Sequence, residues 1–140
     1  MRMKLDAAWL RDFAKRYTGA WCGQSASSVA AFFALNGSLS VNGALAAGRS
    51  AITEVAQGFM TAFPDMELLM DSVAIEGDGA VYHWTFLGTN TGPGGTGHKV
   101  RFSGHEMWKF GENGLIAESQ GHFDAADYQR QLERGVEESD

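Results

Sequence analysis

The stretch LDAAWLRDFAKRYTGAW, residues 5–21, predicts a long amphipathic helix. Its large apolar residues recur at every fourth position: Leu5, Trp9, Phe13, Tyr17 and Trp21. This spacing is close to the 3.6-residue period of an α-helix, so these side chains form one continuous stripe. A stripe that carries four aromatic rings must be buried against a large surface. We therefore expect the rest of the chain to supply one.

Two shorter helices are predicted after the first. A serine within residues 25–28 can cap a helix over VAAFFAL, residues 29–35, which the following Asn-Gly pair would end. Residues 39–46, LSVNGALA, predict a small hairpin, because the Asn42-Gly43 pair tolerates the positive φ angles of a two-residue turn. A third helix is expected after Gly48, with Pro64 as its stop.

The second half of the chain has the composition of β-strands. Four segments rich in β-branched and aromatic residues occupy residues 66–75, 80–91, 98–110 and 115–123, and a last helix is expected from Asp124. Three helices followed by a four-strand meander predict an α+β fold. Its strongly curved antiparallel sheet would wrap around the long N-terminal helix. Such a cone leaves a pocket at its open end.

Composition limits the class of protein. The 140 residues, 44% of them apolar, suit a single domain over residues 1–140. Seventeen acidic against eleven basic side chains give a formal charge of -6, which argues against nucleic acid or an anionic membrane as the partner. The single cysteine, Cys22, cannot form an internal disulfide, and no segment has the length and apolarity of a membrane span. These features predict a cytoplasmic protein.

Several segments, in order, resemble one known family. They are YTGAW, NGALAAGRSAI, FPD, HWTFLGTNTG, the TG before KVRFSG, and GLIAE followed by FDAADYQRQL, and together they cover roughly residues 10–134. The chain resembles the polyketide cyclase-like (SnoaL-like) branch of the nuclear transport factor 2-like superfamily. The resemblance implies a cone-shaped α+β barrel and a homodimer that packs through the sheet face.

The resemblance also implies a class of chemistry. An apolar pocket raises the pKa of a carboxyl group towards neutrality, so that the group can take a proton from a carbon next to a carbonyl and return it. The expected function is isomerisation, dehydration or aldol cyclisation of an apolar or aromatic carbonyl compound, without cofactor or metal. A non-catalytic binding or dimerisation module is the alternative. A dehalogenase or hydrolase on the same scaffold is a third possibility.

Three residues are the candidate proton carriers: Asp124, His122 and His105. The resemblance implies an acid near the end of the last strand, a position that either Asp124 or Gly121 occupies. Because Asp124 opens the last helix, its carboxylate can instead be a helix cap. His105 and Glu106 are neighbours on one strand, so only one of them can face the pocket.

The residues expected to line the pocket are Tyr17, Trp21, Trp84, Phe86, Glu106, Trp108 and Gln120. Gln120 has the same strand parity as Glu118 and His122, so these three line the pocket together or not at all. A register slip of one residue would exchange the inward and outward side chains of a whole strand. The sequence therefore names the candidates and leaves their orientation open.

Overall fold

The first helix of the computed structural model, α1, spans Ala7–Cys22; it confirms the predicted stripe from Trp9 to Trp21, whereas Leu5 precedes the helix. The structure describes residues 5–111 and 113–136. Helix α1 begins at Asp6, whose carboxylate accepts a hydrogen bond from the backbone N–H of Trp9 at 3.0 Å. Its buried side chains are Leu10, Phe13, Ala14, Tyr17 and Trp21. One face of the helix thus lies in the core.

The second helix is shorter than predicted and lies earlier in the chain. Helix α2 spans Ala26–Ala30, with Ser25 as its cap. The prediction of helix up to residue 35 was wrong, because strand β1, Phe33–Val41, already begins inside that segment. Phe33 is fully buried and pairs with Ile116 of the last strand. Pairing in the sheet therefore overrides the helical pattern there.

The described residues form a sheet of six strands in the order β2-β1-β6-β5-β4-β3. After β1 come β2, Ala44–Ala47, helix α3, Arg49–Ala62, and then β3, Glu67–Glu76, β4, Gly79–Thr89, β5, Lys99–Phe110, and β6, Ile116–Phe123. The four predicted strands form the meander, and the predicted hairpin, β1 with β2, extends it beside β6. Strands β1 and β6 run parallel, whereas every other pair is antiparallel.

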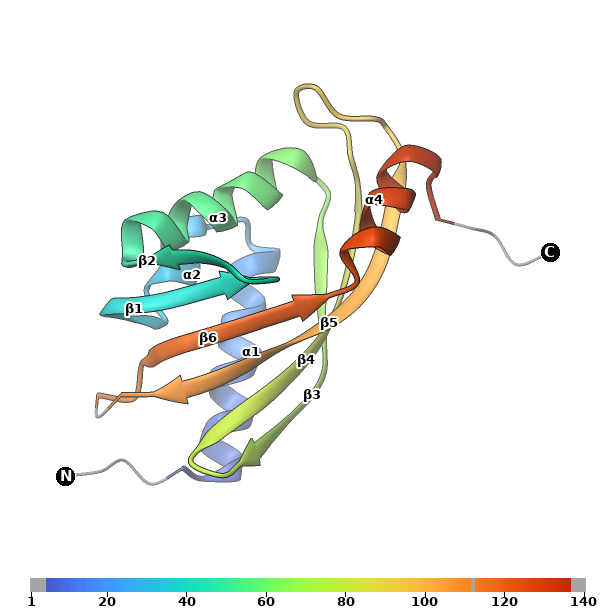
Figure 1. Ribbon diagram of the computed structural model, residues 1–140. Coiled ribbons are helices and arrows are strands. Elements are labelled where there is room, and N and C mark those ends of the chain that lie inside the picture. The colour runs from blue at the N-terminus through green and yellow to red at the C-terminus, as the bar shows by residue number, and fades with distance from the viewer. Residues whose placement is uncertain (1–4, 112, 137–140) are drawn as a thin grey trace.

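The sheet curves around α1, as Figure 1 shows, and helix α4, Ala125–Arg134, lies at the end of β6. The rings of Tyr82 and Trp108, on β4 and β5, stack with centroids 4.8 Å apart. Tyr17 of α1 meets the Trp108 ring edge-on at 5.2 Å. Aromatic contacts thus join α1 to the concave face of the sheet. None of the helices in the described part of the chain is long and apolar enough to cross a membrane.

Candidate functional site

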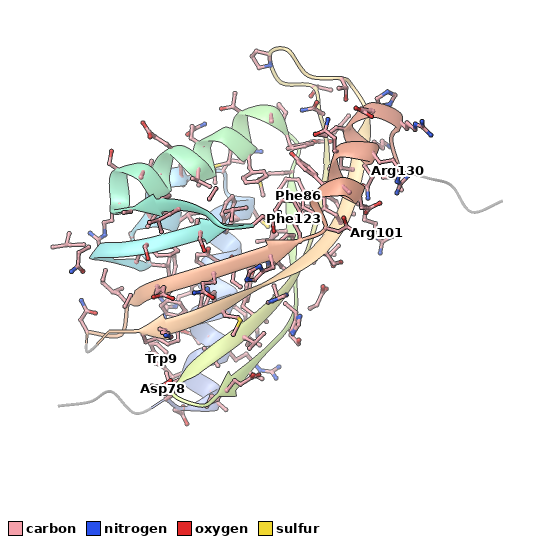
Figure 2. All side chains as sticks on the ribbon, in the orientation of Figure 1. Trp9, Asp78, Phe86, Arg101, Phe123 and Arg130 are labelled. Atoms are coloured by element: carbon pink, nitrogen blue, oxygen red, sulfur yellow. The ribbon has the colours of Figure 1, made fainter. Side chains whose placement is uncertain are left out.

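A pocket lies between α1, α3 and the concave face of the sheet. The pocket is open to solvent, and its residues surround about 530 Å³ of atom-free space when the open solvent at its mouth is counted. Its lining residues are Trp21, Leu39, Val41, Val55, Phe59, Leu68, Trp84, Phe86, Phe102, Glu106, Gly121 and Phe123. Figure 2 labels two of them, Phe86 of β4 and Phe123 of β6, and the ring of each contacts the Phe102 ring of β5. Glu106 is the one ionisable side chain among these lining residues.

Glu106 lies on β5 and faces the inside of the cone, with only 7% of its surface exposed. Its Oε1 atom accepts hydrogen bonds from Ser119 Oγ at 2.7 Å and from Trp108 Nε1 at 3.0 Å. The Tyr17 hydroxyl lies 3.1 Å from Oε1 and 3.2 Å from Oε2. Three side chains from α1, β5 and β6 therefore hold one buried carboxyl group.

The environment of Glu106 favours its protonated form. Burial raises the pKa of Glu106 above its ordinary value, because a charged carboxylate loses hydration there. The hydrogen bonds from Trp108, Ser119 and Tyr17 oppose this effect, because they stabilise the carboxylate. Burial, and the negative charge of Glu106, raise the pKa of Tyr17, which keeps the tyrosine a neutral hydrogen-bond donor. The site thus combines an acid of raised pKa with a fixed set of donors.

The raised pKa predicts a pH-dependent stability that the Glu106→Gln variant lacks. Because the folded protein binds the Glu106 proton more tightly than the unfolded chain, the stabilisation is complete below the unfolded pKa. It is lost as pH rises through the raised folded pKa. The stability of the wild type relative to Glu106→Gln should therefore fall as pH rises through this window. Urea unfolding of both proteins at a series of pH values measures this difference, and a difference that is constant with pH would contradict it.

Two of the predicted proton carriers, His105 and His122, point to the convex face of the sheet. His105 pairs with His83 on one side and with His122 on the other, and its ring lies 5.7 Å and 5.2 Å from theirs. Burial and the two neighbouring histidines lower the pKa of His105. Gln120 shares this outer face, where its amide donates to Glu118 at 2.9 Å. None of these side chains is among the pocket-lining residues.

The third candidate, Asp124, is the N-cap of α4. Its carboxylate accepts a hydrogen bond from the backbone N–H of Asp127 at 3.0 Å, and the side chain is exposed. Gly121, the other possible family acid position, does line the pocket. It lies directly across from Glu106 in the pairing of β5 with β6. On β6, therefore, the pocket-facing residue is a glycine, and the carboxyl group beside it in the pocket is that of Glu106 on β5.

The capping role of Asp124 predicts a modest effect on stability alone. Asp124→Ala should lower the free energy of unfolding by about 1 kcal/mol, the usual cost of losing an N-cap. Asp124→Asn should be close to wild type, because asparagine caps as well as aspartate. Chemical unfolding measures both changes. A proton-carrying Asp124 would instead make Asp124→Asn as inactive as Asp124→Ala in an assay with a confirmed substrate.

The predicted pocket residues fall into three groups. Trp21, Trp84, Phe86 and Glu106 line the pocket. Tyr17 and Trp108 lie behind them and donate to the Glu106 carboxyl group, whereas Gln120 is on the outer face.

Ser119 was not among the predicted site residues. It lies beside Gln120 on β6, so it must face the opposite side, and it is 1% exposed. The sequence signal that could have revealed Ser119 is its position two residues before Gly121, which places both residues on the same face of β6. Within the described residues, no group of three or more histidine, cysteine or acidic side chains is arranged to hold a metal ion.

The chain is similar in structure to several solved proteins. One is AclR, a candidate hydroxylase from Streptomyces galilaeus, at 18% identity and a TM-score of 0.79 over 96% of this chain and 87% of AclR. TsrD from Streptomyces laurentii is 21% identical, with a TM-score of 0.79 over 92% of this chain and 98% of TsrD. A protein of ketosteroid isomerase-like fold from Catenulispora acidiphila DSM 44928, in complex with trimethylamine, is 16% identical, with a TM-score of 0.75 over 86% of this chain and 92% of that protein. At these identities the likeness establishes the fold.

The sequence itself matches one family model. That model describes the SnoaL-like polyketide cyclases, and it covers residues 11–132. Among proteins with curated functions, none matches the chain. The matched segment contains all six strands, the pocket and the residues that hold Glu106. The chain therefore belongs to the SnoaL-like polyketide cyclase family.

Proposed function

We propose that this protein is an acid/base enzyme that acts on an apolar carbonyl compound, with Glu106 as its proton carrier. The observation that carries the proposal is the position of this buried carboxyl group in the wall of an otherwise apolar pocket. Its raised pKa brings proton uptake and release closer to neutral pH. The role assigned from the sequence to Asp124, His122 or His105 thus passes, in this proposal, to Glu106.

The proposed reaction is a proton transfer. Oε2 of the Glu106 carboxylate takes a proton from a carbon next to the substrate carbonyl. The electron pair of the broken C–H bond forms an enolate. Return of the proton to another carbon gives an isomer. Attack of the enolate on a second carbonyl of the same molecule closes a ring, and the alkoxide that forms takes the proton from Glu106. Departure of a β-hydroxyl group with that proton gives a dehydrated product and water. Each outcome needs only atoms of the substrate and the Glu106 proton.

The lining residues favour a neutral ligand. Among the described residues that line the pocket there is no lysine, arginine or histidine, so an anionic ligand would meet only the like charge of Glu106. The Trp84 indole nitrogen is buried and has no hydrogen-bond partner within the described part of the chain. A substrate carbonyl can serve as an acceptor for this donor. Aromatic walls on β4, β5 and β6 suit a flat, apolar ring system.

Non-catalytic binding is the second candidate, and one observation favours it. The Glu106 carboxyl group already has three donors within the protein, as a purely structural buried carboxylate would. In that case the pocket would hold a ligand without proton exchange. The two candidates therefore differ in what happens to the hydrogen atoms next to the ligand carbonyl.

A two-step experiment tests the proposal. Thermal shift against aromatic and polycyclic ketones, lactones and hydroxy acids, with trimethylamine as a cationic comparison, identifies a ligand, because a ligand that binds only the folded state raises the melting temperature. The ligand is then incubated in D₂O with the wild type or with Glu106→Gln. Deuterium uptake next to the carbonyl with the wild type alone supports catalysis by Glu106. Binding without deuterium uptake contradicts catalysis and supports the binding module.

We also propose, as the family resemblance implies, that two copies associate through the convex face of the sheet. Two large apolar side chains, Leu69 and Met107, are 42% and 44% exposed on this face. Burying them would remove apolar surface from water. Light scattering should give the mass of a dimer for the wild type and a larger monomer fraction for Met107→Lys. A monomeric wild type would overturn this proposal.

A further inference from the structure

The two oxygens of the Glu106 carboxyl group have different surroundings. Oε1 accepts from Ser119 at 2.7 Å, from Trp108 at 3.0 Å and from Tyr17 at 3.1 Å. Oε2 has only the Tyr17 hydroxyl, at 3.2 Å. Because Tyr17 lies at nearly the same distance from both oxygens, it does not distinguish them. The asymmetry comes from Ser119 and Trp108.

This asymmetry determines where a proton can reside on the neutral acid. A proton on Oε1 would point at groups that themselves donate hydrogen, and the Trp108 indole N–H cannot reverse its direction because it is a donor only. A proton on Oε2 leaves Oε1 as the carbonyl oxygen and keeps the Ser119 and Trp108 hydrogen bonds. The protonated form is therefore compatible with this arrangement when Oε2 carries the proton.

The arrangement also restricts rotation of the carboxyl group. Ser119 is 1% exposed on β6, and Trp108 is 1% exposed on β5, where its ring stacks on Tyr82. Exchange of Oε1 with Oε2 by rotation would break both hydrogen bonds before new ones form. In a buried site, water cannot compensate for that loss. The hydrogen bonds from Ser119 and Trp108 therefore oppose exchange of the two oxygens.

We propose that Ser119 and Trp108 are positioning residues that hold Oε1 of Glu106 as a permanent acceptor and leave Oε2 as the oxygen that exchanges a proton with the ligand. The ligand part of this statement rests on the proposed function, whereas the assignment of the two oxygens does not. Ser119 and Trp108 act through Glu106 and do not touch the reacting atoms. They also stabilise the carboxylate, which limits how far burial can raise the pKa of Glu106.

Infrared difference spectroscopy of the ligand-free protein tests the assignment of the oxygens. Spectra recorded along a pH titration, with Glu106→Gln subtracted, isolate the Glu106 carboxyl band. In Ser119→Ala the C=O stretch of the protonated acid should move to higher frequency, because its carbonyl oxygen loses a hydrogen bond. The midpoint of the titration should move to higher pH, because the carboxylate loses a donor. Trp108→Phe, which retains an aromatic ring, should change both quantities in the same directions.

The matched control is Ser103→Ala, an exposed serine on the outer face of β5 whose partner is Thr85. It should leave the band and the midpoint unchanged. An unchanged C=O band in Ser119→Ala, with Trp108→Phe also unchanged, would overturn the inference. If the band and the midpoint move as expected but no ligand shows deuterium uptake, the positioning role holds and the proposed function fails.

Discussion

Glu106→Gln is expected to lower kcat/KM by about 10²- to 10⁴-fold, the usual contribution of a general acid or base, and to leave the fold intact. Glutamine has the shape of glutamate, and its amide oxygen can take the place of Oε1 opposite Ser119, Trp108 and Tyr17. Its NH₂ group then replaces Oε2 and cannot accept a proton from the substrate. Steady-state kinetics with a substrate from the ligand screen measures the loss.

The control for this result is the same substitution on the opposite face of the sheet. Glu118 lies on β6 and is paired with Lys109 in the strand register, away from the pocket-lining residues. Glu118→Gln should keep wild-type kcat/KM. Equal activity in Glu106→Gln and in the wild type would refute the role of Glu106 and return the search to other residues.

The position of Gly121 allows a rescue experiment. A Cβ atom built on Gly121 would lie 3.7 Å from Glu106 Cγ and 3.2 Å from the Ser40 carbonyl oxygen, so a side chain there requires that carbonyl group to move by a few tenths of an ångström. Adding Gly121→Asp to Glu106→Gln would supply a carboxyl group at the same level of the pocket. The double variant should recover part of the lost activity, because residues directly paired across two strands have neighbouring side chains. Gly121→Asn in the same background should recover none.

The sequence predicted the architecture best where one pattern extended over many residues. The stripe from Leu5 to Trp21 spans more than four helical turns, so the side of α1 that faces the sheet was determined without any knowledge of its partner. The short apolar run of residues 29–35 had no such length. It reads as helix in isolation, but Phe33 pairs with Ile116 of β6, and this contact is distant in sequence.

The site was less predictable because it depends on strand parity and register. Alternation established that His105 and Glu106 face opposite sides, but not which of them faces inward. In the structure Glu106 shares its face of β5 with the buried Phe102 and Trp108, so Glu106 is the one that faces inward. The contact between Tyr17 and Glu106 joins residues 89 positions apart. No local pattern could predict this contact, although both residues were candidates.

Glu106→Ala is expected to lower the free energy of unfolding by about 3 kcal/mol or more. The change leaves the donors of Trp108, Ser119 and Tyr17 without their acceptor, and an unsatisfied buried polar group costs about 1 to 3 kcal/mol. The hydroxyl groups of Ser119 and Tyr17 can rotate towards other acceptors, but the Trp108 indole N–H is fixed by its stacked ring.

Urea unfolding of Glu106→Ala, Glu106→Gln and the wild type at neutral pH separates the two functions of the carboxyl group. The glutamine variant retains an acceptor and sheds the cost of a buried charge, so it should be at least as stable as the wild type. Its activity should nevertheless be lost, because stability requires only an acceptor at Oε1 whereas proton transfer requires an ionisable Oε2. Equal destabilisation of both variants would show instead that the negative charge itself holds α1 against the sheet.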